Sequence, residues 1–523
     1  MVEGSWTFDP SHYPEPMSPL SADIWFWAMG RGIQAAARDL RAPFGGFDTM
    51  TAGGGWAYER ELDPDWEPDL AALEDAAFHV AERWERHYRG RSHAITDELL
   101  RLRPQRLAPA QAMAAYDRLL VLVQEQWHLH FLTIVPVHAA REVLHDRYVE
   151  LLGKRDELEP YRLIEGLPNE TLDADELLWR VAQRALQLDV ADVILELPAV
   201  AALARLAETH HGREVLGVLG EYLRRYGGRS RLHELSEPRQ AERPELALEG
   251  VRLFLEHPRN LPAEREARER QRAEIVADTL ARIESQAERD SFADLLAHVS
   301  AAVELEESHA YHIDYPGLAA TREALLGFGS RLVAQGRIDS REDVFYLRRD
   351  ELRSALDDDW GAPLQVTVAD RRRERAEAAT RTPAPWLGEE PDANAELPPM
   401  VAKFYGVPGS ATSESDRLTG TPASSGVATG VARVVGGPAD FRRVSGGDVL
   451  VCATTTPAWT PLFPSLAGLV TDTGGILCHA AVVAREYGLP AVVGAEVATR
   501  VIPDGALVRI DGATGQVDVL REG

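Results

Sequence analysis

The spacing of apolar residues changes abruptly along the chain. Between about residues 66 and 375, apolar side chains recur at every third or fourth position, as at Met113, Tyr116 and Leu120, which is the period of an amphipathic helix. Beyond about residue 420, short valine-rich runs alternate with glycine turns, a pattern typical of strands. The sequence therefore predicts a multidomain protein that is mostly α-helical in its N-terminal and middle parts and α/β, of a β/β/α type, at its C-terminus.

Composition divides the chain into four segments. Residues 1–65 are rich in proline, glycine and tryptophan and predict an irregular opening segment with one helix and a turn into a short strand. Residues 66–375 predict a helical domain. Residues 376–419 combine proline, glycine, serine and acidic residues without periodicity, which predicts a flexible linker. Residues 420–523 predict a compact α/β domain, and a chain of 523 residues is long enough for two or three separate cores.

Charge and cysteine content exclude several classes of protein. The net charge of −27 argues against nucleic acid or an anionic membrane as a partner, because both require a basic surface. Neither a run of about eighteen apolar residues nor a signal-peptide pattern is found. The two cysteines, Cys452 and Cys478, form no disulfide framework, so we expect a cytoplasmic protein. Cys478 is either a small residue required at its position or a reactive thiol.

One histidine in the C-terminal segment occupies a position suited to phosphate chemistry. His479 follows a turn at Gly474 and Gly475 and begins an apolar run that predicts a short helix, closed by Gly488 and Pro490. We expect an exposed side chain at the positive end of the helix dipole, where backbone N–H groups from Gly474 through the first helical turn can hold an anion. A neutral imidazole is a competent nucleophile near pH 7. The alternative is a core or capping histidine in an α/β turn.

The residues around His479 resemble the phosphohistidine swivelling domain of the PEP-utilising enzymes, such as PEP synthase, pyruvate phosphate dikinase, rifampicin phosphotransferase and phenylphosphate synthase. The resemblance extends from Gly420 to Leu520, through GTPASSGVATGVARVV, GDVLVCATTTPAWTPLF and the GG-x-x-x-H-A-A core. It implies that His479 is the residue that is phosphorylated. It also implies that the phosphoryl oxygens are held by Thr454, Thr455, Thr456, Gly474 and Gly475. Arg485 adds positive charge there or forms a salt bridge on the helix surface.

Three segments of the helical part resemble, more weakly, the substrate domain of rifampicin phosphotransferase-like proteins. They are EPMSPLSADIW, YGGRSRLHELSEPRQAERPE and GRIDSREDVFYLRRDEL. The resemblance implies a substrate-binding role for Arg229 and Arg239, whose guanidinium groups suit a phosphoryl group or a carboxylate. Structural salt bridges are the alternative. Gly228 and Gln240 stand where the family usually has His and Trp, so a base at position 228 is not available to this protein.

Histidines and aromatic residues in the helical part are further candidates for the acceptor site. Helical spacing places Trp127, Phe131, Ile134 and His138 on one stripe, with His128 and His130 at its edges. Pro136 is expected to kink this helix. These residues either line a pocket for an aromatic substrate, bind a metal, or belong to an ordinary core helix.

The segment EESHAYHID adds three candidates, because relatives often have a similar run there. The resemblance implies that Glu307 and His309 include the base that deprotonates an acceptor hydroxyl, and that Tyr311 lies beside the substrate.

Together these features imply the phosphocarrier and acceptor-binding component of a phosphotransferase. Family members carry an ATP-grasp or a TIM-barrel domain as phosphate donor, and neither is assigned here. We therefore expect a separate ATP-grasp subunit that binds ATP with Mg²⁺, with PEP on a separate subunit as the alternative donor. We also expect no intrinsic metal or cofactor, and a small-molecule acceptor that the aromatic residues suggest is planar or apolar. Two alternatives stay open. One is an ATP-independent isomerase, dehydratase or lyase with His479 as acid or base, and the other a non-catalytic partner of an ATP-grasp protein.

Overall fold

A computed structural model describes residues 3–10, 12–154, 158–357, 363–389, 403, 406, 409, 411–414, 416–455 and 457–520. The chain divides into two compact units. The first contains Met1–Ala139, Leu232–Pro238 and Ser308–Asp392, and the second contains Ala140–Arg231, Arg239–Glu307 and Ala393–Gly523. The division falls inside two long helices, α4 (Pro109–Leu152) and α11 (Gln286–His312). Among the described residues, no helix is both long and apolar enough to cross a membrane.

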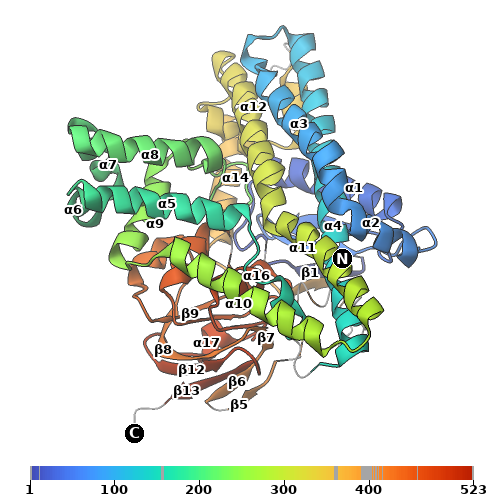
Figure 1. Ribbon diagram of the computed structural model, residues 1–523. Helices are drawn as coiled ribbons and strands as arrows, with labels where there is room; N and C mark the ends of the chain where they lie inside the picture. Colours follow the sequence, from blue (N-terminus) through green and yellow to red (C-terminus); the bar gives the residue numbers. More distant parts are fainter. Residues whose placement is uncertain are drawn as a thin grey trace. The chain divides into compact units, whose positions relative to one another are not determined.

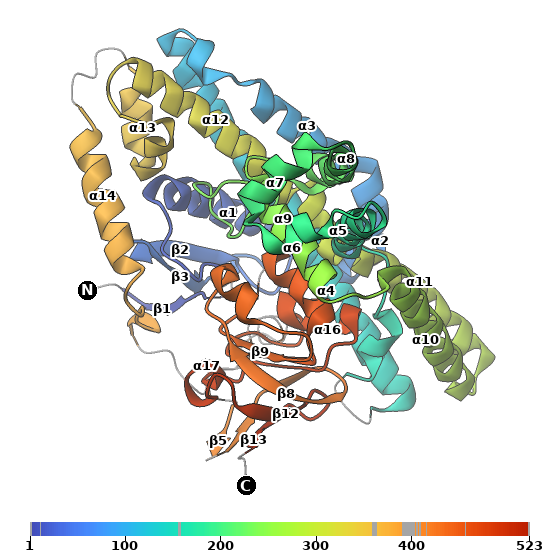
Figure 2. The same cartoon turned by 90° about the vertical axis from the view of Figure 1, so that its left-hand side faces the viewer.

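The first unit contains a small antiparallel sheet with the strand order β2-β3-β1-β4. Its strands are β1 (Ser5–Phe8), β2 (Phe47–Ala52), β3 (Trp56–Glu61) and β4 (Trp386–Gly388). Figure 2 shows β2, β3 and β1 side by side. The prediction of a single short strand within residues 1–65 is therefore wrong. This segment supplies three strands, and the fourth comes from the region predicted as a linker, a pairing between remote residues that local patterns do not reveal.

The helices of the first unit follow the predicted apolar period. Those that lie entirely within it are α1 (Pro19–Asp39), α2 (Leu70–Arg83), α3 (Arg89–Arg101), α12 (Asp314–Ala334), α13 (Arg349–Ala355) and α14 (Gln365–Ala378). The N-terminal part of α4 also belongs here, and the helix continues through Pro136 to a length of 44 residues. The proline therefore does not end the helix.

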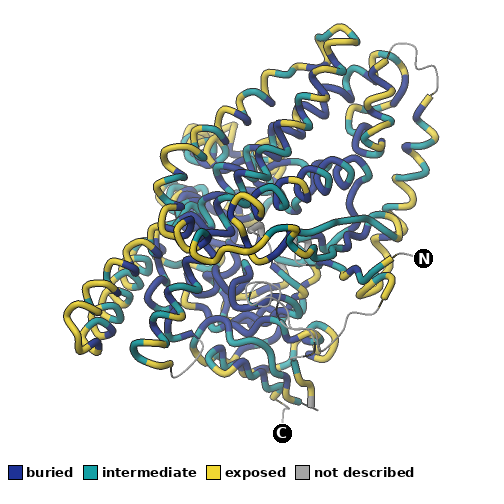
Figure 3. The backbone as a smooth tube through the Cα atoms, turned by 90° about the vertical axis from the view of Figure 1, so that its right-hand side faces the viewer, coloured by how far each residue is buried: buried dark blue, intermediate teal, exposed yellow. Residues whose placement is uncertain are grey.

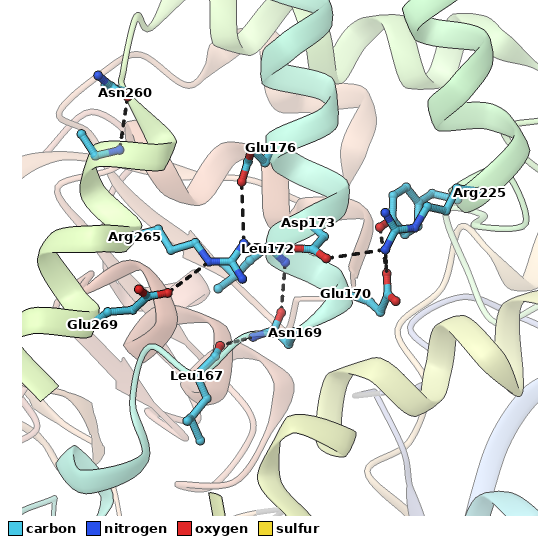
Figure 4. Close-up of polar contacts among 12 residues, drawn as sticks. Leu167, Asn169, Glu170, Leu172, Asp173, Glu176, Arg225, Asn260, Arg265 and Glu269 are labelled. Atoms are coloured by element: carbon cyan, nitrogen blue, oxygen red, sulfur yellow. Dashed lines mark hydrogen bonds and ion pairs between the residues drawn. The ribbon is translucent and has the colours of Figure 1, made fainter. Parts of the chain in front are cut away.

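The helices of the second unit precede the C-terminal sheet in the sequence. They are α5 (Glu170–Gln187), α6 (Ala191–Glu196), α7 (Ala199–Glu208), α8 (His210–Tyr226), α9 (Pro244–Glu256) and α10 (Leu261–Arg282), with the N-terminal part of α11. Only Leu261 and Thr279 of α10 are buried, as expected for a helix with so many charged residues. Arg265 on α10 forms ion pairs with Asp173 (2.9 Å) and Glu176 (3.6 Å) on α5 (Figure 4), so charge links these two helices.

The C-terminal part of the second unit is a nine-stranded sheet with the order β5-β6-β13-β12-β8-β9-β10-β11-β7. Its strands are β5 (Ser413–Glu414), β6 (Arg417–Thr419), β7 (Thr421–Ser424), β8 (Val427–Val434), β9 (Val449–Cys452), β10 (Gly468–Thr471), β11 (Ala491–Val493), β12 (Leu507–Asp511) and β13 (Gln516–Leu520). Figure 1 shows several of them side by side in orange and red. The multidomain prediction of a helical part followed by a C-terminal α/β part is confirmed.

Four neighbouring strands of this sheet, β8 to β11, run parallel to one another. Parallel neighbours require crossover connections, and helix α16 (His479–Tyr487) connects β10 to β11. The small helix α17 (Ala498–Val501) follows β11. Apolar residues such as Val449, Val470 and Val492 are fully buried in the core, and the burial along the chain can be followed in Figure 3. The sheet is therefore a rigid base for the turn that precedes His479.

Candidate functional site

The turn before His479 is shaped by glycine. Gly474 has φ +106°, and a Cβ on it would lie 2.6 Å from Sγ of Cys478, so no other residue fits this turn without a rearrangement. His479 is the first residue of α16, and the helix ends at Gly488, which has φ 60° and ψ 31° as in a left-handed C-terminal cap. The predicted short helix with its glycine stop is confirmed.

The predicted phosphate-binding residues meet at one edge of the sheet. The carboxyl ends of parallel strands lie at the same edge, where α/β proteins commonly bind ligands. Thr454 and Thr455 follow β9, and the turn to His479 follows β10. The backbone N–H of Thr473 donates to the carbonyl of Ala453 over 3.0 Å, which holds the two turns together. Thr455 is buried, and its hydroxyl has no hydrogen-bond partner among the described residues. Thr456 lies outside the described residues.

His479 faces a carboxylate from α11. Its Nδ1 lies 3.6 Å from Oε1 of Glu307, while the other carboxylate oxygen of Glu307 accepts a hydrogen bond of 2.9 Å from the Thr171 hydroxyl on α5. The Nε2 atom of His479 is buried and has no hydrogen-bond partner in the described part of the chain. The expectation of an exposed histidine is therefore wrong, since its side chain is only 19% exposed. The structure does bring together two residues that the sequence predicted as catalytic.

Two of the backbone groups expected to bind an anion are already occupied. The N–H of Leu477 donates to the carbonyl of Lys403 (2.8 Å), and the N–H of Cys478 donates to the carbonyl of Gly475 (3.1 Å). Burial raises the pKa of the Cys478 thiol to about 11. This thiol is therefore neutral near pH 7 and is not a reactive nucleophile.

A second polar cluster lies around Asp175 on α5. Its Oδ2 accepts a hydrogen bond of 2.6 Å from the hydroxyl of Tyr487 at the end of α16, and its Oδ1 lies 3.9 Å from Nη1 of Arg229. Burial raises the pKa of Asp175 to about 6, although the charges of Arg229 and His479 and the Tyr487 hydroxyl act in the opposite direction. Sequence reasoning missed Asp175 and Tyr487, because 312 positions separate them and neither belongs to a motif.

The remaining arginine candidates are buried. Arg229 approaches Asp175, as described above, and the guanidinium of Arg239 donates to the hydroxyl of Ser230. Arg485 lies in the last turn of α16, donates to the carbonyl of Ala423 over 2.9 Å and lies 5.9 Å from the ring centroid of Tyr161. A role for these three residues in binding phosphate or substrate stays a prediction.

Glu486, beside Arg485 on α16, has a buried side chain whose charged form is disfavoured by its surroundings. Burial, together with the neighbouring charge of Glu165, raises its pKa to about 8, against the opposing charges of Arg141, Arg485 and Arg268. The folded protein therefore holds a proton that the unfolded chain releases above about pH 4.5. This group makes the protein less stable as the pH rises from about 4.5 to 8, and its contribution is constant above that range.

Replacing Glu486 by glutamine should remove this pH dependence. We expect Glu486→Gln to leave the free energy of unfolding almost unchanged at pH 5 and to raise it by about 2–4 kcal/mol at pH 9. Chemical denaturation at the two pH values measures the difference. An equal effect at both pH values would show that Glu486 does not titrate in this way.

The acceptor candidates lie in the first unit. The ring of Trp127 stacks on Phe131 with centroids 5.6 Å apart, and both side chains are half-buried. His128 points to Asp39 over 2.9 Å, and His138 is buried. Tyr311 is buried with its ring 5.0 Å from that of Tyr315.

His309 joins two residues that the sequence did not connect with it. Its Nε2 lies 3.6 Å from Oδ2 of Asp314, whose Oδ1 lies 2.9 Å from Nδ1 of His130. Burial acts to raise the pKa of Asp314, yet His130, His309 and His233 together hold it below its usual value. Glu307 and His309 leave α11 on different sides, because two residues correspond to about 200° of helical rotation.

Two regions of the chain match known protein domains. Residues 444–515 match the mobile domain of PEP-utilising enzymes, and residues 130–307 match the rifampicin phosphotransferase fourth domain. The chain is 31% identical to chondramide synthase cmdD of Chondromyces crocatus over 98% of its own length and 14% of that protein. It is 30% identical to the uncharacterized phosphotransferase YvkC of Bacillus subtilis over 78% of its own length and 49% of that protein.

A rifampicin phosphotransferase of Streptomyces sviceus is 32% identical over 64% of the chain and 39% of that protein. The chain thus spans less than half the length of each of these relatives. Both matched regions contain residues of the site, since His479 lies within residues 444–515 and Glu307 within residues 130–307. Residues 444–515 are therefore a mobile domain of the PEP-utilising enzymes, and residues 130–307 resemble the fourth domain of rifampicin phosphotransferase.

Proposed function

We propose that this protein is the phosphocarrier and acceptor-binding component of a phosphotransferase. His479 takes a phosphoryl group from a nucleotide, or from PEP, held on a separate subunit and passes it to a small-molecule acceptor. The observation that supports this most strongly is the position of His479, which begins α16 after the Gly474–Gly475 turn with its Nδ1 3.6 Å from Glu307. The phosphotransferases among the relatives support the reaction class.

Glu307 has a defined part in this reaction. A carboxylate beside Nδ1 favours the tautomer with the proton on that nitrogen, which leaves the lone pair on Nε2. Nε2 then attacks the phosphorus atom, the N–P bond forms, and the bond between phosphorus and the leaving oxygen of the donor breaks. Thr171 holds the other oxygen of Glu307, so the carboxylate is fixed by a residue outside the mobile domain. Glu307 is a positioning residue in this account.

The burial of Nε2 implies movement. A nucleotide cannot reach an atom that is buried within the second unit, so phosphoryl uptake requires the mobile domain to separate from α11 and α5. The contacts of His479 with Glu307, and of Tyr487 with Asp175, are among those that must open. Return of the domain then brings the phosphorylated histidine back to the helical part of the chain. Domain movements of this kind occur over microseconds to milliseconds.

The negative charge on the phosphoryl oxygens must be stabilised by neighbouring groups. Most of what a protein supplies in phosphoryl transfer is positioning and electrostatic stabilisation. We assign this role to Thr454, Thr455, Gly474 and Gly475, because they follow β9 and β10 at the sheet edge where α16 begins. Mg²⁺ prefers several oxygen ligands, whereas Glu307 is the one carboxylate in contact with His479 among the described residues. We therefore place Mg²⁺ with the nucleotide on the donor subunit.

The acceptor is proposed to bind in the first unit. The half-buried rings of Trp127 and Phe131 offer an apolar surface suited to a planar molecule. His309 lies next to this surface through His130, whose ring centroid is 4.7 Å from those of both Phe131 and His309. A hydroxyl on a planar acceptor fits these neighbours, and His309 is proposed as the base that deprotonates it.

Substitution of Glu307 tests the proposal. We expect Glu307→Gln to slow incorporation of label from radioactive ATP or PEP on the order of 100-fold, in the presence of the donor subunit, because the tautomer of His479 is no longer fixed. Glu307→Asp should restore part of the rate, while the melting temperatures of both variants stay near that of the wild type. Incorporation at the wild-type rate in Glu307→Gln would remove Glu307 from the mechanism.

The same pair of residues also suits a second reaction class. A histidine beside a carboxylate can act as a general base, so an isomerase, dehydratase or lyase independent of ATP is the competing function. Turnover of a substrate by the chain alone, without donor or partner, would favour that alternative. A non-catalytic partner of an ATP-grasp protein would show neither turnover nor label.

A further inference from the structure

The second cluster of chemically active side chains lies in the first unit, where three elements meet. His130 comes from α4, His309 from the last turn of α11, and Asp314 is the first residue of α12. One ligand atom from each lies within 4.8 Å of the others, and within the described part of the chain this is the one such group of three metal-ligating residues. The side chains are 16%, 8% and 14% exposed, so they face one another in the interior.

We propose that His130, His309 and Asp314 bind a divalent transition-metal ion such as Zn²⁺. In a tetrahedral zinc site with bonds near 2.0–2.2 Å, neighbouring ligand atoms are about 3.3 Å apart. Nδ1 of His130 lies 2.9 Å from Oδ1 of Asp314, and Nε2 of His309 lies 3.6 Å from Oδ2 of the same carboxylate, on either side of this value. One ligand atom from each of the three residues lies within 4.8 Å of the other two, so rotations of these side chains can bring the three atoms around one ion.

The type of ligand selects the type of ion. Two imidazole nitrogens and one carboxylate suit Zn²⁺ and other first-row transition metals, whereas Mg²⁺ and Ca²⁺ prefer a shell of oxygen atoms. Three protein ligands leave at least one position open for water or for a substrate oxygen, as in catalytic zinc sites. The ligands of this site therefore differ from the oxygen ligands that bind the Mg²⁺ of a nucleotide.

The surrounding structure holds the three ligands in place. Gln126, one turn before His130 on α4, donates through its amide to the carbonyl of Ile313 over 2.6 Å, and Ile313 is the residue between α11 and α12. A Cβ on Gly317 of α12 would lie 1.7 Å from the Gln126 amide nitrogen, so a larger residue at position 317 would displace the Gln126 side chain from this hydrogen bond. Ligands on rigid elements with fixed neighbours bind metal with less reorganisation.

The neighbours of the site suggest its use. The ring of Trp127 lies 5.0 Å from that of His130, and the ring of Phe131 lies 4.7 Å from it. An ion with an open position beside this apolar surface would bind and acidify the hydroxyl of a planar acceptor, and with the ion bound His309 would act as its ligand in place of the general base. This use rests on the proposed phosphotransferase function, whereas metal binding itself does not.

Zinc binding to the purified chain tests the site directly. We expect wild-type protein that is dialysed against a weak chelator to retain one equivalent of Zn²⁺ and to compete with a chromophoric indicator. His130→Ala and His309→Ala should each lower the zinc affinity at least about 100-fold. Removing a metal ligand weakens binding more than removing a residue that only contacts a ligand. His128→Ala is the matched control, because this residue is on the same helix but pairs with Asp39, and it should bind as the wild type does.

Two further results keep the test decisive. The chain has 16 histidines, so weak zinc binding to surface residues is expected, and equal binding by the wild type and by His309→Ala would overturn the proposal. If the alanine variants do not fold, the visible spectrum of Co²⁺ added to the wild-type protein is the alternative test. A visible spectrum of four- or five-coordinate Co²⁺ that Asp314→Asn abolishes supports the site, and a six-coordinate aqueous spectrum contradicts it. These experiments contain no phosphoryl donor or acceptor, so their outcome does not depend on whether His479 is phosphorylated.

Discussion

Replacing His479 by alanine should abolish phosphoryl transfer. We expect incorporation of phosphate from any donor to fall at least about 10⁴-fold, to the background of the assay, because a covalent intermediate cannot form without its nucleophile. The fold should survive, since the side chain is half-buried and its interaction with Glu307 spans 3.6 Å. Autoradiography of wild type and variant, incubated side by side with labelled donor and donor subunit, measures the difference.

A second histidine variant controls for nonspecific loss. His298 is exposed on α11, the helix that also carries Glu307, and His298→Ala should incorporate label at the wild-type rate. Label that remains in His479→Ala, with both variants folded, would mean that another residue accepts the phosphoryl group. Loss of label in both variants would point to damage of α11 or of the donor contact.

The largest effect on stability is expected at Arg141 on α4. Its guanidinium forms a hydrogen-bonded ion pair with Glu306 on α11, and the two side chains are 3% and 7% exposed. Removing one partner of such a pair leaves the other charge buried without its main counter-charge, which costs about 3–5 kcal/mol. We expect Arg141→Met to lower the free energy of unfolding by this amount in chemical denaturation at pH 8.

The pH dependence of this effect identifies its cause. Burial already raises the pKa of Glu306, against the charge of Arg141, and loss of the arginine raises it further. Below that pKa the folded state holds a neutral carboxyl group, so the destabilisation should be smaller at pH 5 than at pH 8. Replacing both partners by apolar residues should recover much of the loss.

An exposed pair on the same helix is the matched control. Arg147 forms an ion pair of 2.6 Å with Glu150, and the glutamate is 67% exposed. Arg147→Met should therefore change the stability by less than about 1 kcal/mol. A loss in Arg141→Met no larger than in this control would contradict the account of the buried pair.

Much of the fold could be predicted from local patterns in the sequence. Apolar residues at helical spacing indicated the helical part of the chain, which contains α5, α8 and α12, because burial of one helix face leaves a local period. Short valine-rich runs between glycine turns indicated the C-terminal sheet, because strands buried on both faces are continuously apolar. The pairing of remote strands leaves no such pattern in the sequence. The pairing of β1 with β4 joins residues near positions 6 and 387, and nothing in either segment indicates the other.

The part of the site that lies in one short motif could be predicted, whereas its contacts with remote segments could not, because such contacts leave no local pattern. His479, Gly474 and Gly475 belong to one short motif and could be identified from it. Glu307 was identified from a different segment, but its contact with His479 depends on how α11 packs within the second unit. Asp175 lies within an ordinary amphipathic helix, where a buried carboxylate is unexpected, so only the structure reveals its contact with Tyr487.

His309 illustrates the limit of single-residue prediction. The sequence marked it as a base, whereas the structure places it in a group with His130 and Asp314. Helical geometry explains why His309 and Glu307 have different neighbours although only one residue separates them. Periodicity placed His128 and His130 at the edges of an aromatic stripe, and the structure shows that His128 pairs with Asp39 instead of joining that group.

The most direct measurement identifies the atom that is phosphorylated. The wild-type chain is incubated with labelled ATP or PEP and the donor subunit, digested at alkaline pH, and analysed by tandem mass spectrometry and ³¹P NMR. Our account predicts one acid-labile, base-stable phosphoryl group, bonded to Nε2 of His479. Phosphate on a threonine or carboxylate, or no phosphate with any donor while the protein is folded, would contradict the phosphocarrier function and favour His479 as a general acid or base.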